Sequence, residues 1–166
     1  MDEHHPDRQA LQAQLAHFRF GMLTTFDAEL GQLRSRPMTN QQLEFDGTLW
    51  FFTADTTGTY REVTREHHVN LSYADPDAMR FVSVSGLASV VRDRERASAL
   101  WSPVYQAFFP GGLDDPHLVL LRVDITQAEY WEASSGRMVQ LYRLAKAALT
   151  GRPADLGTEH RRLDRI

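Results

Sequence analysis

Short extended segments, separated by turn signals, constrain the fold of this chain more than any other feature. The clearest is residues 80–91, in which valines and serines alternate along the chain. A period of two places the valines and Ala88 on one face of a strand and the serines on the other. Gly86, in the middle of this segment, predicts a β-bulge or the close approach of another backbone or a ligand.

Similar segments recur along the chain and predict further strands. The predicted strands cover residues 20–26, 33–41, 48–53, 69–73 and 117–125, the last continuing to Trp131. Helices are predicted over residues 7–18, 57–67 and 137–149, and from Asp93 onward. Thr59 and Glu62 match the T-x-x-E pattern of a capping box, with Thr59 as the cap of the second of these helices. Regular strand–helix alternation and glycine-rich phosphate loops are both absent from the sequence, which argues against a parallel α/β nucleotide fold. We therefore expect a mainly β fold, an antiparallel β-barrel with peripheral helices.

The length and composition suit one soluble domain. We expect residues 1–150 to form it, and residues 151–166 to be a polar, mobile tail. A polar N-terminus and the lack of a long apolar run predict a cytoplasmic protein without a membrane partner. A net charge of −4 gives no sign of nucleic-acid binding. The absence of cysteine excludes disulfides and thiolate metal sites, and the adjacent histidine pairs do not form a metal-binding face, so no metal is expected.

The stretch from Leu33 to Thr59 is the strongest candidate for a binding site. It carries Arg34 and Arg36, whose guanidinium groups suit phosphate geometry, and the aromatic residues 50–52. Pro37 lacks a backbone donor, so this strand is expected at a sheet edge or at a bulge. The pattern predicts a site for a phosphorylated planar ligand; the alternative is a plain hairpin with an exposed basic edge.

Several longer motifs resemble one known family. In order they are SRPM at 35–38, LWFFT at 49–53, VNLSYADP at 69–76, FVSVSGLASVVRDRE at 81–95, LWSPVYQAFFPGGLDDPHLVLLRV at 100–123 and AEYWEASSG at 128–136. Their order and spacing are similar to those of the general stress protein 26 branch of the pyridoxamine 5′-phosphate oxidase-like, FMN-binding split-barrel proteins. The resemblance covers roughly residues 10–136.

The resemblance implies a homodimeric split β-barrel with two flavin sites at the subunit interface. The cofactor would be FMN, or FAD or another flavin. The residues that match the flavin-binding positions of the family, or that could reach the flavin from the dimer interface, are Arg34, Arg36, Pro37, Met38, Phe52, Thr53, Thr57, Gly58, Thr59, Trp101 and Trp131.

One position departs from the family pattern. The loop after the LWFFT strand usually ends in a lysine that helps to neutralise the phosphate, and here that position is Thr59. A phosphate would then depend on Arg34, Arg36 or Arg61, together with hydroxyl and backbone donors. No catalytic acid, base or nucleophile stands out in the sequence.

Three functions follow from the resemblance and stay open at this point. The first is a stress-related, flavin-dependent oxidoreductase, in which the flavin carries the redox chemistry. The second is a flavin-binding sensor or carrier without turnover. The third is a dimeric split barrel that has lost its flavin.

Overall fold

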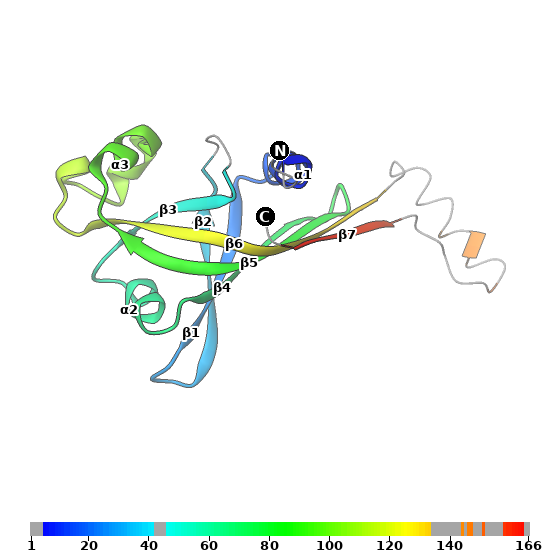
Figure 1. Cartoon of the computed structure of the whole chain (residues 1–166), viewed down its shortest axis with the longest axis horizontal. Helices are drawn as coiled ribbons and strands as arrows, with labels where there is room; N and C mark the ends of the chain where they lie inside the picture. Colours follow the sequence, from blue (N-terminus) through cyan, green and yellow to red (C-terminus); the bar gives the residue numbers. More distant parts are fainter. Residues whose placement is uncertain are drawn as a thin grey trace.

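The computed structural model of the chain describes residues 5–41, 46–133, 144, 146–147, 151 and 158–164. Within these residues the fold consists of seven strands and three helices (Figure 1). The strands are β1 (Phe20–Asp27), β2 (Gln32–Thr39), β3 (Thr48–Ala54), β4 (His68–Asp75), β5 (Arg80–Val91), β6 (Leu118–Ala133) and β7 (Thr158–Asp164). The helices are α1 (His5–Leu15), α2 (Gly58–Arg65) and α3 (Arg94–Leu100), with short 3-10 turns at Pro103–Ala107 and Gly112–Asp114.

The seven described strands belong to one antiparallel sheet, in which six strands follow the order β2-β1-β4-β5-β6-β3. Strand β7 pairs with the second half of β6, residues 127–133, whereas β3 pairs with the first half. The two outer strands, β2 and β3, do not pair with each other in the part of the chain that the structure describes, so the barrel is open along this line. The predicted mainly β fold with an antiparallel barrel is confirmed. Pro37 lies in the outermost strand β2, as expected for a residue without a backbone donor.

Strands β5 and β6 run the length of the molecule, with α3 toward one end and β7 at the other (Figure 1). The predicted bulge in β5 is confirmed, because the pairing register with β6 shifts between Ser85 and Gly86. A Cβ atom on Gly86 would lie 2.6 Å from the carbonyl oxygen of Asp124. Glycine is therefore required here by the close approach of the β6 backbone.

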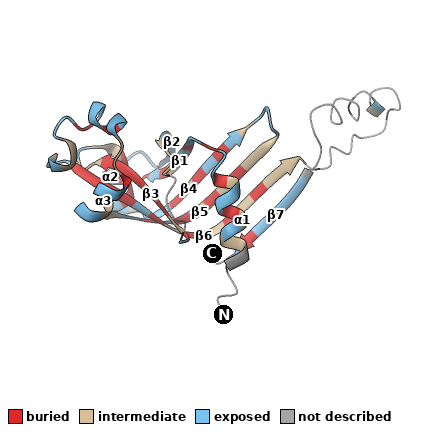
Figure 2. Ribbon diagram, turned by 90° about the horizontal axis from the view of Figure 1, so that it is seen from above, coloured by how far each residue is buried: buried red, intermediate tan, exposed pale blue. Residues whose placement is uncertain are grey.

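The main core lies between the sheet and α1, and buried positions recur along β4, β5 and β6 (Figure 2). The predicted apolar face of α1 is confirmed, since Leu11, Leu15 and Phe18 are all buried. The helix itself ends at Leu15, three residues earlier than predicted. Asn40 fixes this end by donating from its side-chain amide to the carbonyl oxygens of Leu15 and Phe18.

The C-terminal part of the chain differs from the prediction. Residues 151–166 were expected to form a mobile tail outside the domain, but Thr158–Asp164 forms β7, which pairs with β6 along its whole length. Leu163 of this strand is 2 % exposed and belongs to the main core, so the domain extends to this strand. The helix predicted over residues 137–149 lies almost entirely outside the described residues. None of the described helices is long and apolar enough to cross a membrane.

Candidate functional site

A cavity of about 320 Å³ lies between the unpaired strands β2 and β3. Its walls come from the last residues of both strands, from the loop that follows β3, and from the 3-10 turn at Pro103–Ala107 with the residues after it. The lining residues are Pro37, Met38, Thr39, Gln41, Phe52, Thr53, Ala54, Thr57, Tyr105, Phe108 and Phe109. The open line of the barrel therefore holds a cavity, which is the candidate site.

An aromatic cluster forms the apolar wall of the cavity. Phe52 is at its centre, with its ring centroid 4.6 Å from that of Tyr105 and 5.6 Å from that of Trp101. Phe109 packs on the same cluster, whereas the neighbouring Phe108 is 73 % exposed at the cavity. Aromatic side chains suit the faces and edges of a planar ligand, and the exposed Phe108 ring is available for such a contact.

Hydroxyl groups form the polar wall. The Thr53 and Thr57 hydroxyl oxygens lie 3.1 Å apart, and Thr57 donates to the carbonyl oxygen of Ala54 at 2.8 Å. On the opposite side the Gln41 amide donates to the hydroxyl of the buried Tyr105. The residues that line the cavity include no carboxylate, histidine, lysine or arginine. The site can therefore bind an uncharged planar group, but it offers no side chain for acid–base catalysis near neutral pH.

Helix α2 begins immediately beside the cavity. Thr57 is its N-cap, and the Thr57 hydroxyl accepts a hydrogen bond from the backbone N–H of Tyr60 at 3.2 Å. The T-x-x-E sequence at Thr59 and Glu62 had suggested a capping box with Thr59 as the cap, and that prediction is wrong. Both residues are buried inside the first turns of the helix, and Glu62 points toward β2 instead.

Glu62 is the centre of a buried ionic network. It is 5 % exposed and accepts hydrogen bonds from Arg36 Nη2 at 2.6 Å and from Arg34 Nη1 at 3.1 Å. The Thr25 hydroxyl donates to Glu62 and accepts from Arg36 Nη1. This network joins β1, β2 and α2, and it provides the counter-charge that a buried carboxylate requires.

Asp27 completes the network at the far end of β1. Its carboxylate accepts from Arg34 Nη1 at 3.3 Å and from the backbone N–H groups of Glu29 and Leu30. The Leu30 N–H and then the Arg34 guanidinium hold the pKa of Asp27 below its ordinary value. Arg34 Nη1 is thus shared between two carboxylates, and its side chain is still 49 % exposed.

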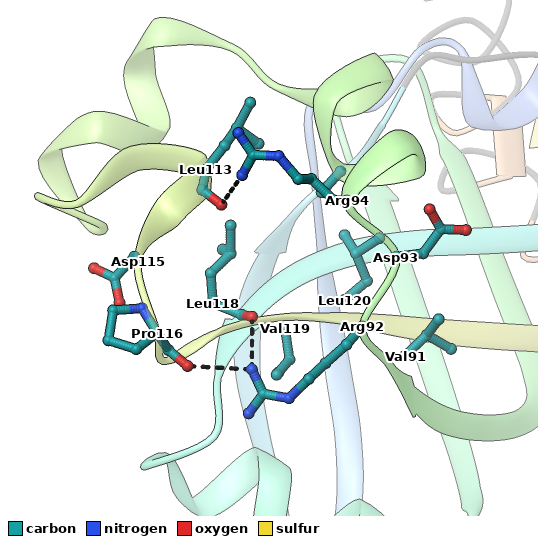
Figure 3. A pocket seen from close by; sticks show the side chains of 11 residues that line it. Val91, Arg92, Asp93, Arg94, Leu113, Asp115, Pro116, Leu118, Val119 and Leu120 are labelled. Atoms are coloured by element: carbon teal, nitrogen blue, oxygen red, sulfur yellow. Dashed lines mark hydrogen bonds between the residues drawn. The ribbon is translucent and has the colours of Figure 1, made fainter.

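A second cavity, of about 220 Å³, lies between α3 and the start of β6 (Figure 3). Its arginines are engaged by the protein itself. Arg92 donates to the carbonyl oxygens of Pro116 and Leu118, and Arg94 donates to that of Leu113 (Figure 3). These contacts tie the loop before β6 to α3 and to the residues between β5 and α3, so we regard this cavity as structural.

Comparison with known proteins identifies the family. The family described as "Pyridoxamine 5'-phosphate oxidase like" matches residues 7–155. The chain belongs to this family. The resemblance seen in the sequence motifs is therefore confirmed.

Individual known proteins are similar over most of the chain. Protein bli-3 of Neurospora crassa is 30 % identical over 145 residues, which cover 82 % of this chain and 69 % of that protein. A crystal structure from Jannaschia sp. CCS1, named for general stress protein 26, has a TM-score of 0.74 and 28 % identity, and the match covers 96 % of this chain and 99 % of that chain. The general stress FMN/FAD binding protein of Xanthomonas citri has a TM-score of 0.66 and 30 % identity, covering 78 % and 90 % of the two chains.

The pyridoxamine 5′-phosphate oxidase-like fold brings together only part of the set expected from the sequence. Five members of that set line the cavity: Pro37, Met38, Phe52, Thr53 and Thr57. Gly58 and Thr59 follow at the start of α2, where Thr59 is 8 % exposed.

The remaining expected residues do not line the cavity. Arg34 and Arg36 lie behind it in the Glu62 network, and Trp101 supports Phe52 from the aromatic cluster. Trp131 stacks on His160 of β7, at the end of β6 away from β3. A contact between Trp131 and a ligand across a dimer interface stays a prediction.

Six residues that line the cavity were not among the site residues expected from the sequence: Thr39, Gln41, Ala54, Tyr105, Phe108 and Phe109. Glu62 of the ionic network was not expected either. Tyr105, Phe108 and Phe109 had a signal, because they lie in the longest motif shared with the family. Glu62 had a signal as well, but the T-x-x-E pattern indicated a helix cap and concealed its pairing with β2. Gln41 stands in a polar stretch after β2 that gives no indication of a binding role.

Proposed function

We propose that this protein binds a flavin, FMN first of all, and acts as a stress-related, flavin-dependent oxidoreductase. The observation that carries the proposal is the cavity between β2 and β3 in a member of the pyridoxamine 5′-phosphate oxidase-like family. A related protein of Xanthomonas citri is named as an FMN/FAD binding protein, which supports a flavin as the ligand.

The lining of the cavity fits such a ligand. A volume of about 320 Å³ lies at the lower end of the range, roughly 300–1,000 Å³, that is usual for small-molecule sites. Met38, Phe52 and Phe108 offer apolar contacts for a planar ring, while the hydroxyls of Thr53 and Thr57 offer hydrogen bonds to a polar chain. The described residues therefore fit the ring and the adjoining chain of a flavin.

The protein's part in the chemistry would be to bind and orient. A bound flavin supplies hydride or electron transfer, and no acidic or basic side chain lines the cavity. Met38, Phe52 and Tyr105 would hold the ring and keep water away from it. A redox enzyme can work in this way, with the flavin supplying the chemistry and the protein supplying the binding site. The second substrate, NADH or NADPH for example, would enter from the open side of the cavity.

The binding test uses a cavity-filling variant. Wild-type protein and the variant Thr39→Trp are each titrated with FMN, FAD and riboflavin, and flavin fluorescence is followed. The substitution places an indole ring in the cavity. Gln32→Trp is the matched control, because Gln32 is exposed at the other end of the same strand. We expect Thr39→Trp to abolish flavin binding and Gln32→Trp to leave it unchanged. Equal binding by both variants would refute the cavity as the site.

Turnover is tested separately. Flavin-loaded protein is mixed with NADH or NADPH under anaerobic conditions, and flavin absorbance is followed before and after oxygen is admitted. Bleaching by the nucleotide and repeated recovery support the oxidoreductase. Tight flavin binding without bleaching by either donor supports the sensor or carrier instead.

We further propose a homodimer, built on the outer face of β1 and β2. Alternate residues of β1 expose apolar side chains there, namely Phe20, Met22 and Phe26, and Leu33 lies opposite Phe26 with 72 % of its surface exposed. An exposed apolar surface of this kind is typical of a protein–protein interface. Light scattering coupled to size exclusion tests the dimer; a monomer whose mass is unchanged by FMN would contradict it.

A further inference from the structure

We propose that His117, Asp55 and Arg92 form a clamp that positions one wall of the cavity, and that protonation of His117 tightens it. The clamp holds the loop between β3 and α2, and this loop supplies Thr57 to the cavity. Ligand affinity therefore rises as the pH falls through the range in which histidine becomes charged. The effect on a ligand rests on the proposed flavin site, whereas the clamp itself does not.

The clamp lies where the ends of three strands meet. Asp55 is the first residue after β3, Arg92 is the first after β5, and His117 is the last before β6. The Asp55 carboxylate accepts from His117 Nδ1 at 2.8 Å through one oxygen and from Arg92 Nη2 at 2.5 Å through the other. The backbone N–H of Asp55 also donates to the carbonyl oxygen of His117 at 3.0 Å. Three contacts from two other segments thus hold this one residue.

Arg92 is the constant half of the clamp. Its Nη1 donates to the carbonyl oxygens of Pro116 and Leu118, which anchors the guanidinium to the start of β6 (Figure 3). Arginine keeps its charge in proteins. The hydrogen bond from His117 and then that from Arg92 hold the pKa of Asp55 below its ordinary value, so Asp55 stays negative in the neutral range. The contact between Arg92 and Asp55 is therefore independent of pH near neutrality.

His117 is the variable half of the clamp. Its side chain is 58 % exposed, so protons reach the ring from the solvent. A carboxylate can only accept, so Nδ1 donates to Asp55 in the neutral and in the charged ring alike. A second proton turns this hydrogen bond into an ion pair. The Asp115 carboxylate accepts from the backbone N–H of His117 at 3.0 Å, so His117 faces two negative groups and the one positive charge of Arg92. Protonation therefore adds net attraction.

The position of Asp55 connects the clamp to the cavity. Ala54 precedes Asp55, and only Thr56 separates Asp55 from Thr57; both Ala54 and Thr57 line the cavity. The backbone N–H and the hydroxyl of Thr57 both donate to the carbonyl oxygen of Ala54, at 3.1 Å and 2.8 Å. Residues 54–57 are thus one hydrogen-bonded turn. A contact that fixes Asp55 also fixes the Thr57 hydroxyl that a ligand would meet.

The first test needs no ligand. Hydrogen exchange of the backbone N–H groups of Asp55 and Thr57 is measured at about pH 5.5 and about pH 8, on either side of the histidine range. The rates are expressed as protection factors, which remove the intrinsic effect of pH on exchange. We expect protection to be about two- to fivefold higher at the lower pH, the size usual for an exposed ion pair. His117→Gln keeps a donor but cannot become charged, and it should abolish this difference.

The matched control is His68→Gln. His68 Nδ1 makes the same kind of contact with Glu66 Oε1, at 2.6 Å, at the other end of α2. We expect this variant to keep the pH dependence at Asp55 and Thr57. Asp55→Asn, which removes the charge that His117 faces, should abolish the dependence as His117→Gln does. A dependence that survives in His117→Gln, or that is absent from wild-type protein, would overturn the clamp.

The second test measures the effect on binding. Riboflavin is the ligand, because the phosphate of FMN itself titrates at about pH 6. We expect the wild-type dissociation constant to rise about two- to fivefold between about pH 5.5 and about pH 8, and that of His117→Gln to stay constant. Protection that depends on pH, together with riboflavin binding that does not, would refute the connection between clamp and cavity. If wild-type protein binds no flavin at either pH, the proposed function fails, and the protection factors still decide whether the clamp exists.

Discussion

Replacement of Gly86 by alanine tests how tightly the central strands are joined. The new methyl group would stand 2.6 Å from the Asp124 carbonyl oxygen and 2.8 Å from a methyl carbon of Val123. Real Cβ atoms do not approach backbone this closely, so one strand has to move. The β6 backbone cannot yield easily, because Asp124 is paired with Leu87 of β5 on one side and Thr48 of β3 on the other.

The size of the effect follows from two opposing terms. Overpacking of this kind costs about 1–3 kcal/mol. Replacing a flexible glycine lowers the conformational entropy of the unfolded chain, which stabilises the folded protein by about 0.4–1 kcal/mol. We therefore expect Gly86→Ala to lower the free energy of unfolding by about 1–2 kcal/mol, which for a domain of this size means a melting temperature lower by about 2–8 °C.

The assay is urea unfolding followed by tryptophan fluorescence, with thermal unfolding as a second measurement. Ser89→Ala, at an exposed position of the same strand, is the control and should change stability little. Both variants are compared with wild-type protein at one protein concentration, because subunit association would make the midpoint depend on concentration. A Gly86→Ala protein as stable as wild type would show that the strands are not held as closely as described.

Three further predictions concern the site and its charges. Glu62→Gln leaves Arg34 and Arg36 without their shared buried carboxylate, and we expect a loss of about 3–5 kcal/mol of stability in urea unfolding; an unchanged midpoint would contradict the network. Phe108→Ala should weaken flavin binding about 3- to 10-fold, because a stacking contact contributes about 0.5–1.5 kcal/mol. The melting temperature should not change, because the ring is exposed. A lowered melting temperature with unaltered binding would instead give Phe108 a structural role. Acid should destabilise the protein, because the Leu30 N–H beside Asp27 and the Arg80 guanidinium beside Glu132 hold the pKa of each carboxyl below its ordinary value, 3.8 and 4.5 respectively. The stability that these two carboxylates contribute is present above pH 4.5 and is lost as the pH falls through the lowered pKa values. A urea midpoint that rises below pH 4.5 would contradict this prediction.

The parts of the fold that could be predicted are those whose side chains repeat with the period of their own element. The alternation in residues 80–91 predicted the strand, and Gly86 within it predicted the bulge; the structure confirms both. Leu11, Leu15 and Phe18 likewise predicted the buried face of α1. In each case the local pattern and the tertiary packing agree, so the sequence alone sufficed.

The parts that could not be predicted depend on a distant partner. Strand β7 is polar apart from Leu163, and it is extended because β6 offers it an edge to pair with. Glu62 has a local interpretation as a helix cap, and only the packing of α2 against β2 shows that it holds two arginines. The conformation of a short polar segment therefore cannot be predicted without its tertiary neighbours. The same holds for the pairing of a charged side chain that has two possible partners.

A crystal structure of the complex with FMN is the most direct measurement of the proposed site. We predict the flavin ring in the cavity between β2 and β3, against Met38 and Phe52. A ring bound elsewhere would contradict the cavity as the flavin site.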